Sequence, residues 1–468
     1  MEALNNKLKS RTLFVLAALI GGFALSGCQN PFLQLAADSS HHTYSSSGYT
    51  VSFNTQGGSA ISALSVPPGG KVSEPEPTKA HFILEGWYKD AALSKPWDFD
   101  GDTVNSNITL HSKWIFDGIQ GDGTPENAFL VYDVPTLMAV GRSGTDKDGN
   151  VWTTAACYLQ IDNIQWDPND NWSPLLVPFT GSYDGDGYAI SRLYCNPPLP
   201  YYLQPVGLFG TLAGASTVKD LSLLDVVVKG GDRIGAIAGW VRDPTASIKN
   251  CYVTGSVGGN GIINSKFIGG IAGASSGTVE NCYVNCTVKG SRYVGGIAGT
   301  IASSKIINCH TTGIVSGDGD VGGIVGESAS GVILNCLAEN EVIGGGLGGI
   351  AGIITYGKVM NCVALNKNLN TPDGGTPVFF RLWVINSNYS PVASNNYARR
   401  GMLMDGVPFN DDGDHTGQDG QSIDKGQFNS FAWWTTTAVW ADEGWDFTNT
   451  WEWDNTRKLP KLKGLGGR

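Results

Sequence analysis

Five Asn-Cys pairs stand at intervals of 26 to 31 residues in the middle of this 468-residue chain. Cysteine thiolates bind soft metal ions and carry redox reactions, and a stacked repeat would bring five of them close together. However, the sequence has no CxxC spacing and no Cys/His cluster of the kind that structural zinc requires. We therefore expect buried free thiols, with no metal and no cofactor. The pairs are Asn250-Cys251, Asn281-Cys282, Asn308-Cys309, Asn335-Cys336 and Asn361-Cys362.

A sixth cysteine, Cys28, lies in a different setting. It ends the run Leu25-Ser26-Gly27-Cys28, which follows the apolar residues 12–24. A positive segment precedes these residues, with Lys7, Lys9 and Arg11. This arrangement resembles a bacterial lipobox, which implies that residues 1–27 are a signal peptide and that Cys28 is diacylated. More than one acyl chain gives durable membrane anchoring. Gln29 follows where an aspartate would favour the inner membrane, so we expect the outer membrane; a plain secretion signal is the alternative.

Acidic residues raise the questions of calcium binding and catalysis. Asp184 and Asp186 flank Gly185, and we expect a tight turn there rather than a site. The acidic residues 410–420 lack the spacing and the closing glutamate of an EF-hand, so calcium remains only an alternative. Glycosidases on β-helices need paired acids on one outer face. The outward positions beside the cysteines carry no such pair, so we expect no catalytic residue and no enzyme; a polysaccharide-degrading enzyme is the lesser alternative.

A glycine-rich anchor recurs with the cysteines and defines the architecture. A period of this size is typical of a stacked repeat array. Small and β-branched residues alternate around each cysteine, which predicts short strands, and no amphipathic helical window separates them. We therefore predict an all-β fold whose main part is a capped β-solenoid over residues 206–366. The anchors occupy residues 206–210, 235–239, 269–273, 295–299, 322–326 and 348–352.

The asparagine of each pair has a structural role in such a solenoid. The alternation of inward positions changes phase just before each cysteine, so the chain must bend there. Asparagine tolerates a left-handed corner and hydrogen-bonds nearby backbone. We expect an asparagine ladder that satisfies corner amides, followed by a ladder of small buried thiols.

The repeats resemble the GLUG motif of bacterial surface proteins, in which a (V/I)-G-G-(I/L)-(A/V)-G anchor precedes an N-C-Y-type segment. Clear copies are residues 294–299 with 308–313 and residues 234–239 with 250–255. The same family occurs in some IgA-cleaving zinc metallopeptidases. The six histidines here form no HExxH, so the resemblance does not imply peptidase activity.

Residues 49–115 resemble the Listeria–Bacteroides repeat, which is also the B-repeat of internalins. The matching stretches are VSFNTQGGS, EGWYKD, WDFD and LHSKW. The resemblance implies a small β-grasp-like spacer or interaction module. Trp87, Trp97 and Trp114 could form a sugar-stacking platform, but we expect core packing because a unit this small has few other residues with which to build a core.

The remaining segments are predicted to link or cap these modules. Residues 28–48 are serine-rich and predict a flexible tether, in which His41 and His42 are solvated. Residues 117–205 predict the N-terminal cap and first coils, with a short strand and one helix between residues 131 and 141. Residues 367–468 predict an irregular coil and a terminal cap built from six of the 14 tryptophans. They are Trp433, Trp434, Trp440, Trp445, Trp451 and Trp453.

Composition agrees with an exported, non-enzymatic protein. The net charge of −11 without a basic stripe argues against a nucleic-acid partner. Sixty-four glycines and only 16% charged residues suit flat stacked coils. A Cys157–Cys195 disulfide is allowed in an oxidising envelope but is not established by the sequence. We predict a lipid-anchored, surface-displayed envelope protein that binds an unknown protein or glycan; the alternative is a glycan-binding lipoprotein of nutrient capture, using the terminal tryptophans or Tyr252 and Tyr283.

Overall fold

The computed structural model describes residues 48–116, 120–145, 149–198, 204–259, 265–372, 378–385, 391–409, 412–440 and 444–465. The chain divides into two compact units, Met1–Ile115 and Phe116–Arg468. The proposed signal peptide, Cys28 and most of the tether lie outside the described residues. Within those ranges, no helix has the length and apolar character needed to cross a bilayer.

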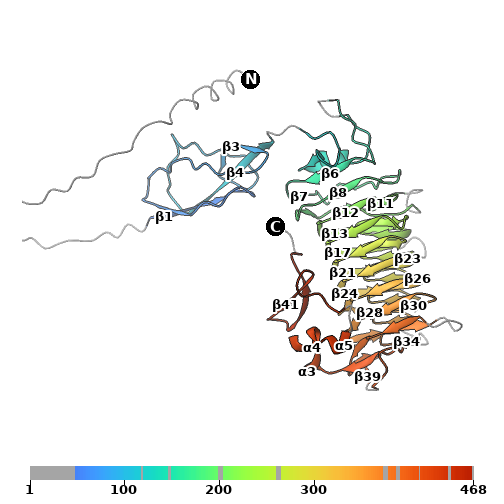
Figure 1. Ribbon diagram of the computed structural model, residues 1–468. Helices are drawn as coiled ribbons and strands as arrows, with labels where there is room; N and C mark the ends of the chain where they lie inside the picture. Colours follow the sequence, from blue (N-terminus) through green and yellow to red (C-terminus); the bar gives the residue numbers. More distant parts are fainter. Residues whose placement is uncertain are drawn as a thin grey trace, which may run out of the picture. The chain divides into compact units, whose positions relative to one another are not determined.

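The first unit contains a four-stranded mixed sheet with the order β2-β1-β4-β3 (Figure 1). Strands β1 and β4 are parallel, whereas β1 and β2 are antiparallel. Trp87 and Trp97 are buried with Val51 and Leu110, which confirms the expectation of core packing for these two tryptophans. The strands are β1 (Tyr49–Asn54), β2 (Leu64–Val66), β3 (Phe82–Tyr88) and β4 (Ile108–Phe116).

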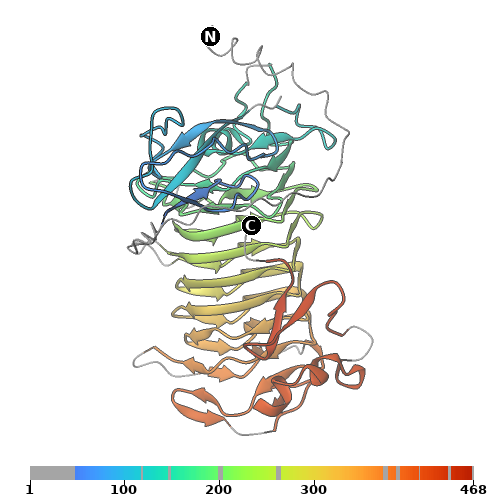
Figure 2. The same ribbon diagram turned by 90° about the vertical axis from the view of Figure 1, so that its left-hand side faces the viewer.

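The second unit is a parallel β-solenoid of about eight turns, which confirms the predicted fold class (Figures 1 and 2). Its coils contribute strands to three sheets. Sheet 1 consists of β7 (Ile164–Gln165), β9 (Ala189–Ser191), β10 (Tyr194–Cys195), β13 (Ser222–Gly230), β17 (Tyr252–Gly259), β21 (Tyr283–Lys289), β24 (His310–Ser316), β27 (Leu337–Ala338), β28 (Glu341–Ile343), β32 (Val363–Ala364), β33 (Asn368–Asn370), β37 (Tyr397–Arg399), β38 (Met402–Met404), β39 (Val407–Phe409) and β40 (Gln421–Ile423).

The other two sheets complete each coil. Sheet 2 consists of β5 (Phe129–Val131), β6 (Cys157–Gln160), β8 (Ser182–Asp184), β11 (Phe209–Leu212), β12 (Thr217–Lys219), β15 (Ala238–Val241), β16 (Ser247–Lys249), β19 (Ala272–Ser275), β20 (Thr278–Glu280), β23 (Ala298–Ile307), β26 (Val325–Leu334), β30 (Ala351–Ile354), β31 (Lys358–Met360), β35 (Trp383–Ile385) and β36 (Val392–Ser394). Sheet 3 consists of β14 (Asp232–Gly235), β18 (Lys266–Gly269), β22 (Arg292–Gly295), β25 (Asp320–Gly322), β29 (Gly346–Gly348) and β34 (Val378–Phe380).

The coils pair in register, so equivalent residues stack along the solenoid. Val253 pairs with Val284, which pairs with Thr311 in the following coil. The inward side chains of the three sheets form one continuous apolar core that extends from Phe129 to Met404. Burial of this core is the main favourable term in the stability of the stack.

The glycine anchors lie at the corner where the chain passes from sheet 3 to sheet 2. They are required because adjacent coils approach closely at this corner. A Cβ atom on Gly296 would lie 2.2 Å from the carbonyl oxygen of Gly323 in the next coil. The equivalent distance is 2.3 Å from Gly270 to the oxygen of Gly296 and 2.0 Å from Gly323 to that of Gly349. Real Cβ atoms do not approach backbone oxygens this closely, so any side chain here must force the coils apart.

A short strand and one helix open the solenoid, as predicted. Strand β5 pairs with β6, and α2 (Val134–Ala139) follows it. The Asp133 side chain caps the helix by accepting a hydrogen bond from the N–H of Thr136, whose hydroxyl group contacts the backbone N–H of Asp133 in return. This capping box and the burial of Leu137 fix the helix on the first coils.

The far end of the stack is covered by residues 412–422, which include most of the acidic loop. The backbone N–H of Leu382 donates to the carbonyl oxygen of Gln418 at 3.0 Å. Beneath this loop the Arg381 side chain is fully buried, and its guanidinium group donates to Ser422 Oγ at 2.7 Å. The loop thus satisfies backbone groups that the last coil would otherwise expose.

The tryptophan-rich C-terminal segment (residues 424–465) packs on the side of the stack, which corrects the expectation that it covers the end. It buries Leu337, Val363 and Tyr397, whose side chains point outward from sheet 1. Figures 1 and 2 show this segment running back alongside the coils. Its elements are α3 (Lys425–Phe428), α4 (Phe431–Thr435), α5 (Thr437–Trp440), β41 (Trp451–Asp454) and β42 (Leu459–Leu462).

A charged cluster joins the C-terminal segment to the solenoid. Arg457 donates two hydrogen bonds to the Glu339 carboxylate, at 2.9 and 2.8 Å, and His310 Nε2 lies 2.7 Å from the same group. Burial alone would raise the pKa of Glu339, but the hydrogen bond from His310 and the charge of Arg457 outweigh it and hold this pKa below its usual value. The carboxylate is therefore ionised at neutral pH and holds the segment in place.

We predict that Gly296→Ala destabilises the second unit by about 1–3 kcal/mol, because its Cβ must displace the backbone of the next coil. The free energy of unfolding in urea measures this cost. Gly144→Ala is the control, since a Cβ there meets no atom within 4 Å. Equal stability of the two variants would contradict the close approach of the coils.

We predict that Glu339→Gln lowers the stability of the C-terminal segment at pH 7 by roughly 1.5–3 kcal/mol, the range for hydrogen bonds to charged groups. Since the folded-state pKa lies below the usual 4.5, the wild-type advantage is complete above that pH and disappears as the pH falls further. Urea unfolding followed by tryptophan fluorescence at pH 7 and at lower pH tests this. Glu452→Gln is the control. Glu452 forms an exposed ion pair with Lys461 across the β41–β42 hairpin, so this substitution should change the stability little. A pH-independent difference for Glu339→Gln would contradict the assignment.

Candidate binding surfaces

The structure places the five predicted asparagines in a ladder at the corner between sheets 2 and 1. All five have φ between 52° and 54°, the left-handed conformation. Asn250 Nδ2 donates to Asp220 Oδ1 at 2.8 Å, Asn281 Nδ2 to Asn250 Oδ1 at 3.0 Å, and Asn308 Nδ2 to Asn281 Oδ1 at 3.1 Å. Asn335 and Asn361 continue the column and are buried. Asp220 therefore begins the ladder with a carboxylate in place of an amide.

The asparagine side chains bond one another rather than the corner amides, which corrects that part of the expectation. The corner N–H of Asn250 instead donates to the carbonyl oxygen of Glu280 in the next coil at 3.0 Å, and that of Asn281 to Ile307 at 3.0 Å. Parallel in-register pairing satisfies the backbone without help from side chains, so the amides are left to form their own column.

The five thiols follow the asparagines into the core. Cys251, Cys282, Cys309, Cys336 and Cys362 are fully buried and free. Each sulfur lies 3.1–3.3 Å from the carbonyl oxygen two residues before it. A carbonyl can only accept, so each sulfur keeps its proton and donates. Burial raises the pKa of the outer and middle members, Cys251, Cys309 and Cys362. Neutral, inaccessible thiols are neither nucleophiles nor metal ligands.

The positions at which a disulfide or a calcium site was only an alternative are also described, in part. Cys157 and Cys195 are unpaired, and Cys195 is buried. Asp184 pairs with Lys219 at 2.5 Å at the ends of the paired strands β8 and β12, just before the turn that contains Asp186. Within the described part of the chain, no three His, Cys, Asp or Glu side chains are gathered so as to hold a metal ion. Cys28, His41 and His42 lie outside the described residues.

A row of aromatic rings runs along the outside of sheet 1. Tyr252 and Tyr283 stack with centroids 5.2 Å apart and an interplanar angle of 8°, and Tyr283 stacks on His310 at 4.8 Å. The C-terminal segment covers the lower part of this row, and Tyr283 packs against it. Stacking occupies both faces of Tyr283 and one face of Tyr252, so the rings within this row do not offer a sugar an open platform.

The terminal tryptophans are also mostly unavailable to a ligand. Trp434, Trp440, Trp445 and Trp451 are buried in the cluster that fixes the C-terminal segment to sheet 1. Only the half-buried Trp433 and Trp453 retain exposed surface among the six. The alternative use of these tryptophans as a sugar-binding platform is therefore not supported by their burial.

A second aromatic row involves sheets 2 and 3, with Trp240 in β15, Phe267 in β18 and Tyr293 in β22. Phe267 and Tyr293 stack at 5.3 Å, and the Arg233 guanidinium carbon lies 5.2 Å from the ring centroid of Trp240. The Arg292 guanidinium carbon lies 4.6 Å above the Tyr293 ring. Again the ring faces contact one another or an arginine, so the row strengthens the coil stack.

Sequence reasoning missed a second column of amides inside the core. Asn340 and Asn366 are fully buried. Asn340 Nδ2 donates to the carbonyl oxygen of Gly323 at 2.8 Å, and Asn366 Nδ2 donates to Asn340 Oδ1 at 2.8 Å. Asn340 and Asn366 stand four residues after consecutive ladder cysteines, Cys336 and Cys362, and this spacing was the available signal. Their hydrogen bonds hold the glycine corner from within.

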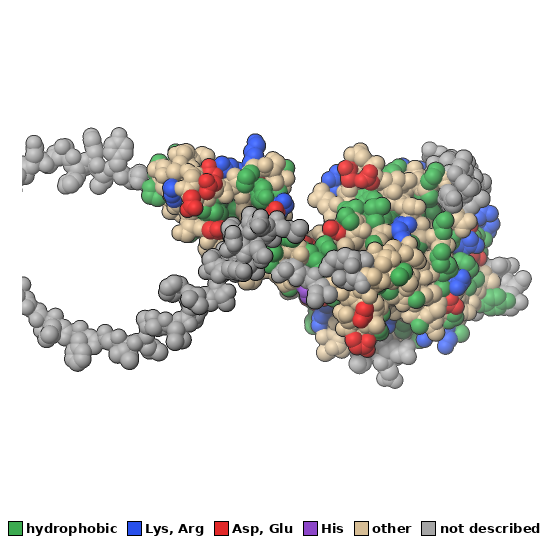
Figure 3. Space-filling model, turned by 90° about the horizontal axis from the view of Figure 1, so that it is seen from above, with side chains coloured by type: hydrophobic (Ala, Val, Ile, Leu, Met, Phe, Trp, Pro, Cys, Tyr) green, Lys and Arg blue, Asp and Glu red, His purple; other side chains and the backbone are tan. Residues whose placement is uncertain are grey.

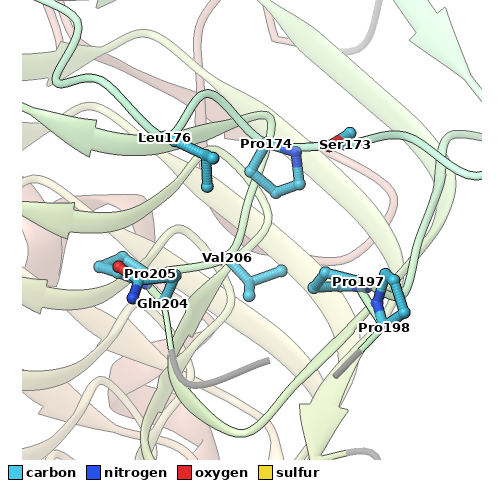
Figure 4. Close-up of a pocket in the computed structure, with 8 residues that line it drawn as sticks. All are labelled: Ser173, Pro174, Leu176, Pro197, Pro198, Gln204, Pro205 and Val206. Atoms are coloured by element: carbon cyan, nitrogen blue, oxygen red, sulfur yellow. The ribbon is translucent and has the colours of Figure 1, made fainter. Parts of the chain in front are cut away.

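An apolar pocket of about 240 Å³ opens beside β11 (Figure 4). Pro174, Pro197 and Pro205 line it together with Leu176 and Val206. Its lining residues carry no ionisable side chain and few polar groups, so it offers contact area but little basis for specificity.

Comparison with known proteins identifies the repeat domain in one part of the chain. Residues 49–113 match the family model of the Listeria-Bacteroides repeat domain. Two proteins of Evansella cellulosilytica, a candidate Gly-rich membrane protein and a candidate membrane protein, are each 43% identical to this chain over 67 residues. These residues are 14% of this chain and only 8% and 10% of those proteins. Halomucin of Haloquadratum walsbyi is 30% identical over 120 residues, which are 25% of this chain and 1% of that protein.

The solenoid is similar to a solved structure. A candidate immunoglobulin A1 protease from Bacteroides ovatus superposes with a TM-score of 0.50 and 20% identity, covering 75% of this chain and 97% of that chain. At this identity the likeness shows the fold alone. The chain is thus a repeat-containing protein in which a Listeria-Bacteroides repeat domain precedes a parallel β-solenoid.

Proposed function

We propose that this protein is a non-enzymatic component of a bacterial cell envelope, anchored by lipid on Cys28 and displayed at the surface for adhesion or another macromolecular interaction. The observation that carries the proposal is the combination of an extended solenoid with a repeat domain that also occurs in proteins named as membrane proteins. Solenoids offer long lateral faces for macromolecular partners. We also assign the coils to the GLUG motif on the strength of their glycine anchors and Asn-Cys corners.

The surface chemistry supports binding rather than catalysis. Each ladder thiol is buried, and several carboxylates of the coils are paired with lysine or arginine, as Asp184 is with Lys219 and Asp320 with Arg292. On the face that Figure 3 shows, acidic and basic side chains are interspersed. This mixture and the net charge of −11 argue against a nucleic-acid partner.

Glycan binding by an envelope lipoprotein is the second candidate. The terminal tryptophans do not favour it because four of the six are buried, and Tyr252 and Tyr283 use the faces between them on each other. A polar cleft beside the asparagine ladder does favour it, because its lining combines amides, carboxylates and hydroxyl groups. Both candidate functions require the lipid anchor on Cys28, and they differ in the molecule that the protein binds.

We predict that externally added protease digests the protein on intact cells, because a lipid on Cys28 holds it at the outer face. Immunoblotting of treated cells, with a periplasmic marker as control, measures the digestion. In the Cys28→Ala variant the protein should lose its acyl chains, leave the membrane fraction and no longer be digested at the cell surface. Protection of the wild-type protein until the cells are permeabilised would place it inside the envelope and contradict surface display.

A further inference from the structure

We propose that a cleft between the C-terminal segment and the first asparagine corners binds a neutral oligosaccharide. This inference rests on the glycan-binding alternative above and gives that function a site. The cleft has a volume of about 510 Å³. Asp220, Ser222 and Asn250 line its solenoid wall, and Asn449 and Leu462 belong to the opposite wall. Its volume lies within the range of small-molecule sites.

The cleft exists because the outer row of sheet 1 changes from large to small residues. Tyr252 pairs in register with Ser222, which pairs with Ala189 in the coil before. The aromatic row therefore stops at Tyr252, and the small, buried Ser222 above it lies at the base of the cleft. The C-terminal segment runs back along the stack to this level and closes the other side with residues 462–465 (Figures 1 and 2).

The lining offers many hydrogen bonds to a ligand. Asn250 donates one N–H to Asp220 and accepts one from Asn281, so the ladder uses one donor and one acceptor of its amide. An amide has two donors and two acceptor lone pairs, which leaves further capacity on the cleft side. The hydroxyl group of Ser222 and the amide of Asn449 add groups that both donate and accept. Sugar hydroxyl groups, which also do both, match such a lining.

The charges around the cleft favour a neutral ligand. Lys219 Nζ lies 3.1 Å from Asp220 Oδ2 and 2.5 Å from Asp184 Oδ2, so it balances the carboxylate that begins the ladder. Asp186 and Lys463 add one charge of each sign to the lining. Asp184, Asp186 and Asp220 face only two lysines, of which Lys463 alone lines the cleft, so an anionic sugar would meet a net negative charge. A neutral sugar meets no such repulsion.

The arrangement also favours a sugar over a peptide. Peptides commonly bind by adding a strand to an open sheet edge. The cleft walls come from corners and turns, and strand β13 is already paired with β9 and β17 on its two sides. Leu462 and Leu465 provide apolar area among the polar groups. This suits the C–H face of a pyranose ring.

A single substitution adds bulk at the base of the cleft. Ser222 is only 4% exposed and pairs with Tyr252, whose ring stacks on Tyr283, so the ring of Ser222→Tyr must occupy the space above Tyr252. Thr287→Tyr adds the same ring at an exposed outward position of the same sheet away from the cleft and controls for the added tyrosine. Asn449→Ala removes one amide from the opposite wall and tests the same site without adding bulk.

The test is isothermal titration calorimetry of the full chain in detergent with neutral and uronic-acid oligosaccharides of two to four units. We expect a neutral oligosaccharide to bind the wild type, Ser222→Tyr to weaken binding at least about tenfold, Asn449→Ala to weaken it severalfold, and Thr287→Tyr to leave it within about twofold.

Other outcomes overturn the inference in distinguishable ways. Binding that survives both Ser222→Tyr and Asn449→Ala would place the glycan elsewhere and leave glycan binding itself intact. A preference for uronic-acid oligosaccharides would contradict the neutral ligand. No binding of any neutral oligosaccharide by the wild type would remove both the site and the glycan-binding function, while surface display would still be decided by protease digestion of cells.

Discussion

The close approach of successive coils at the glycine corners is the constraint on which the rest of the solenoid depends. Neighbouring coils follow the inter-strand spacing of about 4.8 Å. At Gly296 and Gly323 this spacing leaves no room for a Cβ. Because the coils stay in register, every outward or inward position becomes a column of equivalent residues. The amide ladder, the thiol ladder and both aromatic rows follow from that single geometric fact.

The columns have different roles according to where they face. Inside, valines, thiols and the hydrogen-bonded Asn340 and Asn366 make a close-packed core. Outside sheet 1, the column changes from Ser222 through Tyr252 to Leu337. The apolar end of that column is covered by the C-terminal segment, and the cleft lies beside its small, buried end. Binding capacity thus arises where a repeated column ends.

The sequence predicted well whatever repeats. The repeat period, the glycine anchors and the left-handed bend at Asn250 and its equivalents can be recognised locally in the sequence. This is because each coil packs between two coils equivalent to itself. It predicted poorly what does not repeat. Nothing in the tryptophan spacing says that residues 424–465 lie on the side of sheet 1 rather than at its end. The outward residues Leu337 and Val363 did carry that information, since an uncovered solenoid would keep polar side chains there.

The candidate site shows the same difference between features that repeat and features that do not. The asparagine ladder was predicted from its corner geometry, but the cleft beside it depends on a contact between parts of the chain more than 200 residues apart, Ser222 and Leu462 among them. Such a contact is set by tertiary packing, and periodicity does not encode it. The buried Arg381 and the loop over it are invisible to sequence reasoning for the same reason.

Hydrogen–deuterium exchange of the full chain, with and without a bound neutral oligosaccharide, tests the central claim most directly. The account predicts slow exchange throughout the coil strands in both states. It also predicts ligand-dependent protection confined to peptides around residues 220–222, 250 and 449–465. Protection instead at the Trp240 and Tyr293 row, or in residues 49–115, would show that the column end beside the asparagine ladder is not the binding site.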